Sequence, residues 1–369
     1  MENFHSFRNR IFAYQILSLT NTCNLRCTYC DWQKEYGFPL TKENLTVAEK
    51  NLKDSRIFAD KAFGDFLMAV FSGGEPMLFP EILELFLEIY SDKWVRISTN
   101  GLFDSSRILP ALAKHKRLIL TASLDGIDMF GNRARFTKRS QLAKVIENIF
   151  AALDNGNLMM ILCTINKYNI DVFFDFTQQI YEMYRPYFDC GRIVMPAHYI
   201  TAYTNPVGLP SKTQEEKFIA RLEHEISYNP LLAAVDWHYR SLISYVKNKN
   251  HNDCQVERWS RCAHFLDKEM IETGIMHSYL CPMRGYGDMG TFDIHNIPSD
   301  FAERYDKLYN HVYSGSRCSC FVDWTAFDAV LKNEVTIKRA ATWFAFFRDN
   351  RVVNWIKRYK RMNLRNRMT

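Results

Sequence analysis

Six short apolar segments alternate with helical segments over the first half of the chain, and each apolar segment ends in a polar loop. The apolar segments span residues 12–20, 66–72, 94–99, 118–123, 158–165 and 191–196. Helical periodicity lies between them, at residues 41–61, 81–90, 105–114, 142–153 and 172–184. Strands that alternate with helices pair in parallel through right-handed crossovers. The pattern therefore predicts an α/β fold whose polar loops gather at the carboxyl ends of the strands.

The loop after the first segment carries three cysteines, Cys23, Cys27 and Cys30, separated by three and then two residues. Three thiols in one loop can reach one inorganic core together. A 4Fe-4S cluster normally takes four thiolates, so a loop that supplies three leaves one iron open for chemistry. The alternative is a zinc site completed by a distant His or Cys. Spacing alone leaves both alternatives open.

The second apolar segment runs into a turn made of Gly73, Gly74, Glu75 and Pro76. Two glycines allow the backbone to approach a ligand closely, and Glu75 offers an acceptor. Pro76 withdraws one backbone donor and fixes the turn. Because this turn follows a strand, as the cysteine loop does, we expect the two to lie at the same edge of the sheet.

Together these motifs resemble the radical S-adenosylmethionine (radical SAM) superfamily, whose signature is C-x3-C-x2-C with an aromatic residue, here Tyr29, before the third cysteine. The resemblance implies that Cys23, Cys27 and Cys30 hold a 4Fe-4S cluster whose open iron chelates SAM. One electron then cleaves SAM to methionine and a 5′-deoxyadenosyl radical, which abstracts hydrogen from the substrate. The implied fold is a partial (β/α)6 TIM-like barrel.

The same resemblance implies the SAM contacts. The Gly-Gly-Glu-Pro turn corresponds to the family motif that holds the SAM amino group, and Ser-Leu-Asp-Gly at the end of the fourth segment corresponds to one that lies near SAM. An arginine ten residues after that Asp contacts the carboxylate, which gives Arg135; Arg133 is close by, and the choice between the two stays open. The expected cofactor contacts are Tyr29, Gly73, Gly74, Glu75, Pro76, Asn100, Ser123, Asp125 and Arg135.

Three further side chains, His198, Tyr199 and Tyr203, follow the sixth segment at the end of the sheet where a substrate should lie. His198 and Tyr199 are the candidates for a catalytic role, and ordinary packing is the alternative. Cys163 and Cys190 lie in or beside predicted strands, which favours thiols of the core over ligands.

Cysteines resume in the second half of the chain, at Cys254, Cys262, Cys281, Cys318 and Cys320. Gly274 can turn a hairpin that brings residues 262 and 281 to neighbouring strands. This part resembles the auxiliary-cluster module called SPASM or twitch, which implies one auxiliary 4Fe-4S cluster. The expected ligands are Cys262, Cys281, Cys318 and Cys320, with Cys254 as a substitute; a zinc site or free thiols are the alternative.

Composition narrows the class of protein. The chain has 369 residues, 47% of them hydrophobic, which is enough for a large α/β domain and a smaller one. We expect a radical SAM core over residues 1–210, a linker and SPASM/twitch-like domain over 211–325 and a helical basic tail over 326–369. No secretion signal or membrane-spanning run is recognisable, and clustered thiols indicate metal ligation in a reducing cytoplasm.

The net positive charge of the chain comes from its C-terminal tail. Residues 351–369 carry seven positive side chains and no acid, more than the whole net charge of +6. Val352, Trp355, Ile356, Tyr359 and Met362 recur at helical spacing, so one face is apolar and the other cationic. Such a helix can dock on the enzyme itself, which we expect, or contact an anionic membrane peripherally. No nucleic-acid binding is expected, because no binding module accompanies the charge.

The chain is therefore predicted to be an oxygen-sensitive radical SAM oxidoreductase. Its expected substrate is a peptide or protein side chain, with a sugar, cyclitol or other small molecule as the alternative. A non-catalytic zinc or iron-sulfur protein is the alternative from a different class. The resemblance also implies a low-potential electron donor such as a flavodoxin or ferredoxin as the partner.

Overall fold

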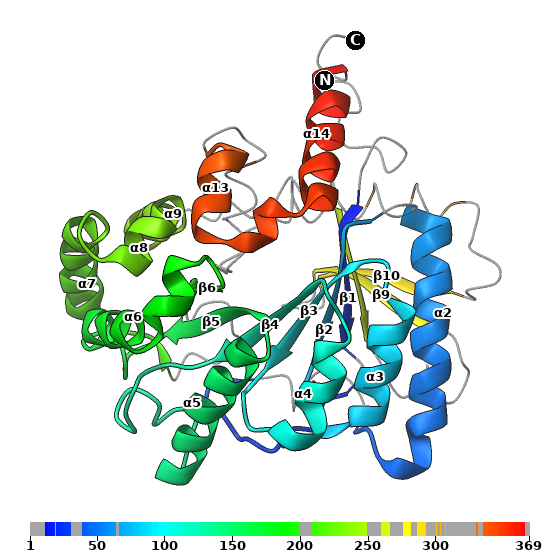
Figure 1. The fold of residues 1–369 in the computed structure, drawn as a ribbon, viewed down its shortest axis with the longest axis horizontal. Helices are drawn as coiled ribbons and strands as arrows, with labels where there is room; N and C mark the ends of the chain where they lie inside the picture. Colours follow the sequence, from blue (N-terminus) through cyan, green and yellow to red (C-terminus); the bar gives the residue numbers. More distant parts are fainter. Residues whose placement is uncertain are drawn as a thin grey trace.

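The computed structural model describes residues 12–18, 20–30, 39–63, 66–199, 208–248, 260–265, 276–281, 286–292 and 335–365, together with the single residues 300, 303, 307 and 330. In these ranges the strands form one twisted sheet flanked by helices (Figure 1). Five residues singled out in the sequence, Tyr203, Cys254, Gly274, Cys318 and Cys320, lie outside the described residues.

Six parallel strands form the centre of the sheet, in the order in which they occur in the chain. Each is a mainly apolar run whose described side chains are mostly buried, which suits a parallel strand covered on both faces. The strands are β1 (Phe12–Ser18), β2 (Met68–Ser72), β3 (Trp94–Thr99), β4 (Leu118–Ser123), β5 (Leu158–Ile165) and β6 (Ile193–Val194). The predicted parallel α/β sheet is confirmed, and it is the open partial barrel of the predicted class.

The sixth segment differs from the prediction. Residues 191–196 form only the two-residue β6, and a second short strand, β7 (Ala197–Tyr199), pairs with β5 further along. Pro196 lies between them and has no N–H to donate to a ladder, so the pairing is interrupted there. His198 and Tyr199 consequently lie in a strand rather than in a loop.

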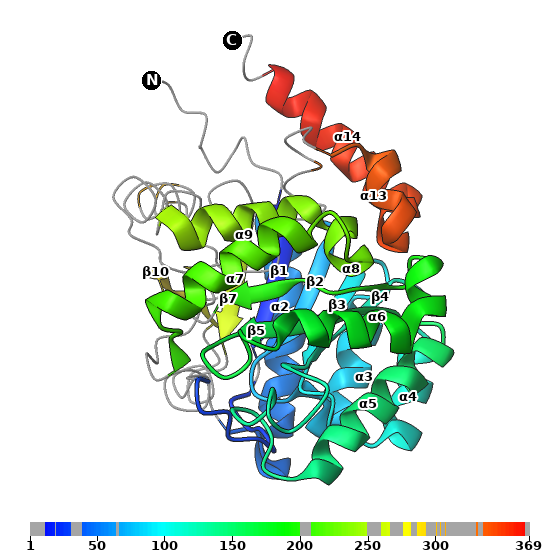
Figure 2. The ribbon, with the colours of Figure 1, turned by 90° about the vertical axis from the view of Figure 1, so that its left-hand side faces the viewer.

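Helices connect the strands, and several of them lie side by side along one side of the sheet (Figures 1 and 2). The crossover helices are α2 (Leu45–Phe63), α3 (Pro80–Ile89), α4 (Ser105–Ala113), α5 (Arg139–Asp154) and α6 (Phe173–Asp189). After β7 follow α7 (Lys212–Glu225), α8 (Pro230–Ala234) and α9 (Asp236–Asn248). Short 3-10 turns lie at Lys42–Asn44 and Pro76–Leu78.

Three later strands extend the same sheet beyond β1. They are β8 (Ser260–Phe265), β9 (Met276–Cys281) and β10 (Tyr286–Phe292). β8 pairs in parallel with β1, whereas β9 pairs antiparallel with β8 and β10. The backbones of Cys262 and Cys281 thus lie on neighbouring antiparallel strands, the arrangement that the predicted hairpin requires. Among the described residues, no helix is long and apolar enough to cross a membrane.

The described chain ends in α13 (Ile337–Trp343), a 3-10 turn at Ala345–Arg348 and α14 (Asn350–Arg365). On the apolar side of α14, Val352, Trp355 and Ile356 are buried and Tyr359 is partly buried. The preceding turn is anchored on β3, where the Phe346 ring lies 4.8 Å from the Trp94 ring. Docking on the protein itself, the expected arrangement, therefore accounts for these four side chains.

Deleting residues 351–369 should lower the free energy of unfolding by about 3 kcal/mol or more, because each fully buried large apolar side chain contributes about 1.5–3 kcal/mol. Urea unfolding of the full and truncated chains measures the loss. The matched control, Lys357→Gln with Arg361→Gln, changes exposed cations and should leave stability unchanged. Salt-sensitive sedimentation of the full chain with anionic liposomes, lost on truncation, would instead favour the membrane alternative.

Candidate functional site

The cysteine loop lies at the carboxyl end of β1 and is half-buried against the core. A turn closes it, in which the Cys30 N–H donates to the Cys27 carbonyl at 3.1 Å. The Thr28 N–H donates to the Ala134 carbonyl at 2.8 Å, which ties the loop to the segment after β4. Burial raises the pKa of the Cys27 thiol to about 12, against the lowering effect of Arg135. The Cys27 thiol therefore keeps its proton at neutral pH unless a metal ion binds the sulfur and displaces it.

No group of three His, Cys, Asp or Glu side chains in the described part of the chain is arranged to hold a single metal ion. The loop offers three thiols, a donor set that suits a 4Fe-4S cluster.

Two side chains from other loops approach the thiols. The Asn100 amide donates to Asn24 Oδ1 at 2.7 Å and lies 3.5 Å from Cys23 Sγ. Arg135 Nη1 lies 3.9 Å from Cys27 Sγ. These contacts bring the ends of β3 and β4 to the cysteine loop, so predicted residues from three strand ends meet at one place.

The glycine turn after β2 packs against the start of the cysteine loop. The Gly74 N–H donates to the Thr20 carbonyl at 2.7 Å, and the Glu75 N–H donates to the Thr22 carbonyl at 2.8 Å. A Cβ on Gly74 would lie 2.1 Å from the Thr22 oxygen, closer than any real contact. The two loops can therefore approach one another only because this position has no side chain.

Replacing Gly74 by Ala should lower stability by about 2–3 kcal/mol, since the two loops must separate and give up their hydrogen bonds. Thermal or urea unfolding measures the effect. Gly156→Ala is the control: its φ is +97° but its Cβ would meet nothing within 4 Å. The control should cost only about 1–2 kcal/mol of backbone strain. Equal losses in both variants would contradict the steric explanation.

The carboxylate of Glu75 is fully buried and accepts three hydrogen bonds. The donors are the Met77 N–H at 3.0 Å, the Thr99 hydroxyl at 2.7 Å and the Asn100 N–H at 2.6 Å. Desolvation raises the Glu75 pKa to about 7 although these donors oppose the shift. The side chain thus joins the ends of β2 and β3, and the main chain of the turn is the part left to meet a ligand.

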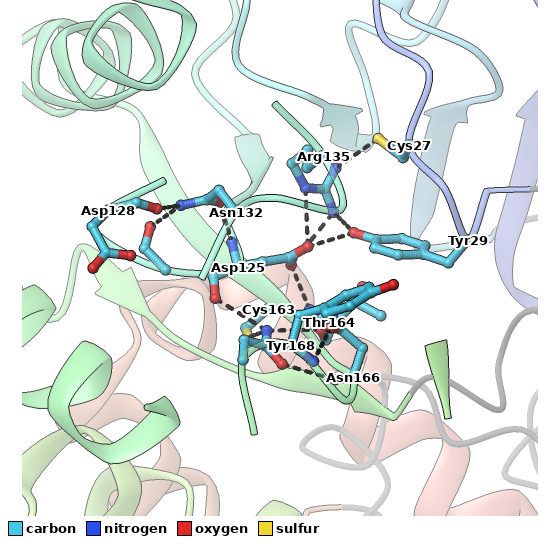
Figure 3. A network of polar contacts seen from close by, with 12 residues as sticks. Cys27, Tyr29, Asp125, Asp128, Asn132, Arg135, Cys163, Thr164, Asn166 and Tyr168 are labelled. Atoms are coloured by element: carbon cyan, nitrogen blue, oxygen red, sulfur yellow. Dashed lines mark hydrogen bonds and ion pairs between the residues drawn. The ribbon is translucent and has the colours of Figure 1, made fainter. Parts of the chain in front are cut away.

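A second buried network surrounds Asp125, after β4 (Figure 3). Its carboxylate accepts from the Tyr29 hydroxyl at 2.6 Å, from Arg135 Nε at 3.3 Å and from the Thr164 N–H at 2.9 Å. Arg135 also donates to the Tyr29 hydroxyl. The network joins the cysteine loop to β4 and β5. Of the two arginines considered, Arg135 is the one that reaches the cysteine loop.

Sequence reasoning did not assign the asparagines that hold these loops. Asn132 accepts from the Asp125 N–H at 3.0 Å, and Asn169 donates to the Asp125 carbonyl at 3.0 Å. Both are buried, and both lie in loops at strand ends. The available signal was asparagine in a turn, where its side chain commonly bonds nearby backbone.

The remaining predicted residues are not part of the two hydrogen-bond networks described above. Ser123 ends β4 and is half-buried. His198 and Tyr199 are buried, and the Tyr199 hydroxyl donates to Glu215, contacts that fit the packing alternative. The structure describes only the backbones of Cys262 and Cys281, so the auxiliary ligand set stays a prediction.

Comparison with known proteins identifies the domain. Residues 17–180 match the family model of the radical SAM superfamily. The chain carries a radical SAM domain. This match bears out the predicted radical SAM domain over residues 17–180, and the cofactors of such a domain are a 4Fe-4S cluster and SAM.

The alignments with curated relatives cover less than half of this chain. The chain is 32% identical over 176 residues to molybdenum cofactor biosynthesis protein 1 of Homo sapiens, covering 45% of this chain and 26% of that protein. It is 31% identical over 144 residues to GTP 3′,8-cyclase of Aquifex aeolicus, covering 38% of this chain and 43% of that enzyme. The chain thus spans less than half of either relative.

Solved structures show the same fold over more of the chain. The structure described as native anSMEcpe with bound AdoMet and Kp18Cys peptide has a TM-score of 0.53 and 17% identity, covering 82% of this chain and 84% of that one. Streptococcus suis SuiB bound to S-adenosylmethionine has a TM-score of 0.55 and 13% identity, covering 82% and 68%. At these identities the likeness concerns the fold alone.

Proposed function

We propose that this chain is a radical SAM enzyme that cleaves SAM reductively and uses the resulting radical to abstract hydrogen from a substrate. The observation that carries the proposal is the loop of Cys23, Cys27 and Cys30 at the carboxyl end of β1, inside the matched domain. When bound there, a 4Fe-4S cluster supplies the electron that cleaves SAM to a 5′-deoxyadenosyl radical and methionine.

The chain's own residues would hold and orient the cofactors. The three thiols ligate the cluster, and Asn100 and Arg135 donate toward two of them. The main chain of Gly73 and Gly74 would hold the SAM amino group, while Glu75 fixes that turn through its buried carboxylate. Tyr29 and Asp125 hold the Arg135 guanidinium, the group proposed for the SAM carboxylate.

The test is anaerobic purification with iron and sulfide analysis, followed by incubation with dithionite and SAM. We expect 5′-deoxyadenosine and methionine in equal amounts. If neither product forms in protein that holds iron and sulfide, the chain is not a radical SAM enzyme in function.

A peptide or protein side chain is the proposed substrate. The support is the fold that this chain shares with anSMEcpe, whose structure contains a peptide, over 82% of its length. A nucleotide or other small molecule is the second candidate, favoured by the sequence likeness to GTP 3′,8-cyclase. Mass spectrometry of reactions with GTP separates the two, because conversion of GTP would exclude the peptide proposal.

We also propose one auxiliary 4Fe-4S cluster on Cys262, Cys281, Cys318 and Cys320. The antiparallel pairing of β8 with β9, which carry two of these residues, supports it. About eight iron atoms per chain are expected, four for each cluster, and zinc in the auxiliary place would contradict the proposal. We also propose a low-potential electron donor, which would reduce the cluster that cleaves SAM. The proposed location is the cytoplasm, where a reducing environment keeps cysteine thiols available as ligands.

A further inference from the structure

Two cations that form no ion pair with a described residue lie beside the candidate site, at the same edge of the sheet. Arg133 belongs to the loop after β4 and Lys167 to the loop after β5. Neither forms an ion pair with any residue in the described ranges, and neither has a role in the proposed SAM site. Arg135, two residues from Arg133, is the arginine that faces the cysteine loop.

The Arg133 guanidinium lies over two aromatic rings. Its guanidinium carbon lies 4.3 Å from the centre of the Phe130 ring and 4.4 Å from that of the Tyr168 ring. We call these three residues the Arg133 stack. Rings contact the faces of a guanidinium, whereas its N–H donors lie in its plane. Contacts with two rings restrict the guanidinium, and the donors in its plane can still reach an anion.

A second cation and an exposed ring adjoin the stack. The Lys167 ammonium lies 4.9 Å from the centre of the Tyr168 ring, and the Phe130 side chain is 51% exposed. Of the nearby acids, Asp128 accepts from the Gly131 N–H and Asp171 accepts from Gln214. Neither carboxylate pairs with the two cations, so the positive charge is not neutralised by these neighbours.

The loops that carry the stack are fixed by buried asparagines. The Asn132 amide donates to the Asp128 carbonyl at 2.8 Å, and the Tyr168 N–H donates to Asn166 Oδ1 at 2.9 Å. Asn169 joins the two loops through the Asp125 carbonyl, and Figure 3 shows Asp125 between Asn132 and Asn166. A site that is already ordered loses little conformational entropy when it binds.

We propose that the Arg133 stack, together with Lys167, binds an anionic group of the substrate, either a carboxylate or a phosphate. This inference rests on the proposed function, because the bound anion is part of a substrate only if the chain is a radical SAM enzyme. The carboxyl end of the sheet is where a radical SAM domain would meet its substrate, and a planar guanidinium suits both kinds of oxyanion.

The test measures binding of two probes to the full chain by calorimetry, namely tripolyphosphate and a triglutamate peptide. We expect one of them to bind, and Arg133→Gln to weaken it at least about tenfold, one step of about 1.4 kcal/mol. Arg133→Lys should bind with intermediate affinity, since it keeps the charge without the planar stack. Arg139→Gln, an exposed arginine at the start of α5, is the matched control and should bind like the unaltered chain.

The probe that binds identifies the oxyanion as phosphate or carboxylate. Equal affinity in Arg133→Gln, or no binding of either probe, would overturn the inference. A loss of SAM binding in Arg133→Gln would also overturn it, because the arginine would then belong to the SAM site. Probe binding requires no radical chemistry, so its failure is distinguishable from failure of SAM cleavage.

Discussion

Replacing Cys23, Cys27 and Cys30 together by Ala should abolish SAM cleavage and remove one cluster's iron from the chain. In the described part of this loop these three residues are the only cysteines. Without their thiolates the loop has no ligands with which to bind the cluster. The measurements are iron analysis and 5′-deoxyadenosine formation under dithionite. We expect no product above the rate without enzyme.

The fold should survive this change, because the three side chains are only half-buried and each loses a single sulfur. Cys190→Ala is the control: Cys190, expected to be a core thiol, is instead exposed at the end of α6, and the variant should keep both iron and activity. If the auxiliary site exists, the triple variant keeps about half of the iron, since each cluster holds four atoms. SAM cleavage that persisted in the triple variant would refute the cluster assignment.

Regular structure was predictable from the sequence where local signals agreed. The strands at residues 94–99, 118–123 and 158–165 have the predicted boundaries, because each is a buried apolar run followed by a polar turn. The sixth strand was predicted too long because Pro196 breaks the ladder, a constraint that apolar periodicity does not carry.

The sequence predicted that residues from several strand ends would meet at one edge of the sheet, but it did not predict how they pair with one another. Tyr29, Asp125 and Arg135 were expected as separate SAM contacts, yet they bond to one another across 96 and 106 positions of sequence. Such pairs depend on how loops meet in space, which spacing along the chain does not encode. Glu75 also differs from the expectation: its carboxylate was expected to face a ligand, but it is buried and accepts hydrogen bonds from neighbouring loops.

Replacing Asp125 by Ala should lower the free energy of unfolding by about 3–5 kcal/mol, because it removes the carboxylate partner of the buried Arg135 guanidinium. The Arg135 side chain is only 7% exposed, and its Nε lies 3.3 Å from the lost carboxylate. The Thr164 N–H and Tyr29 hydroxyl lose an acceptor as well. Urea unfolding of cofactor-free protein measures the loss.

Asp128→Ala is the matched control on the same loop. The Asp128 side chain is exposed and accepts a hydrogen bond from the Gly131 N–H at 2.9 Å, so its loss should cost about 1 kcal/mol. A double-mutant cycle with Arg135→Met identifies the cause. If the unpaired guanidinium dominates, the double variant should be more stable than the sum of the two single losses predicts. Strictly additive losses would mean that Asp125 stabilises the fold through Thr164 and Tyr29 rather than through Arg135.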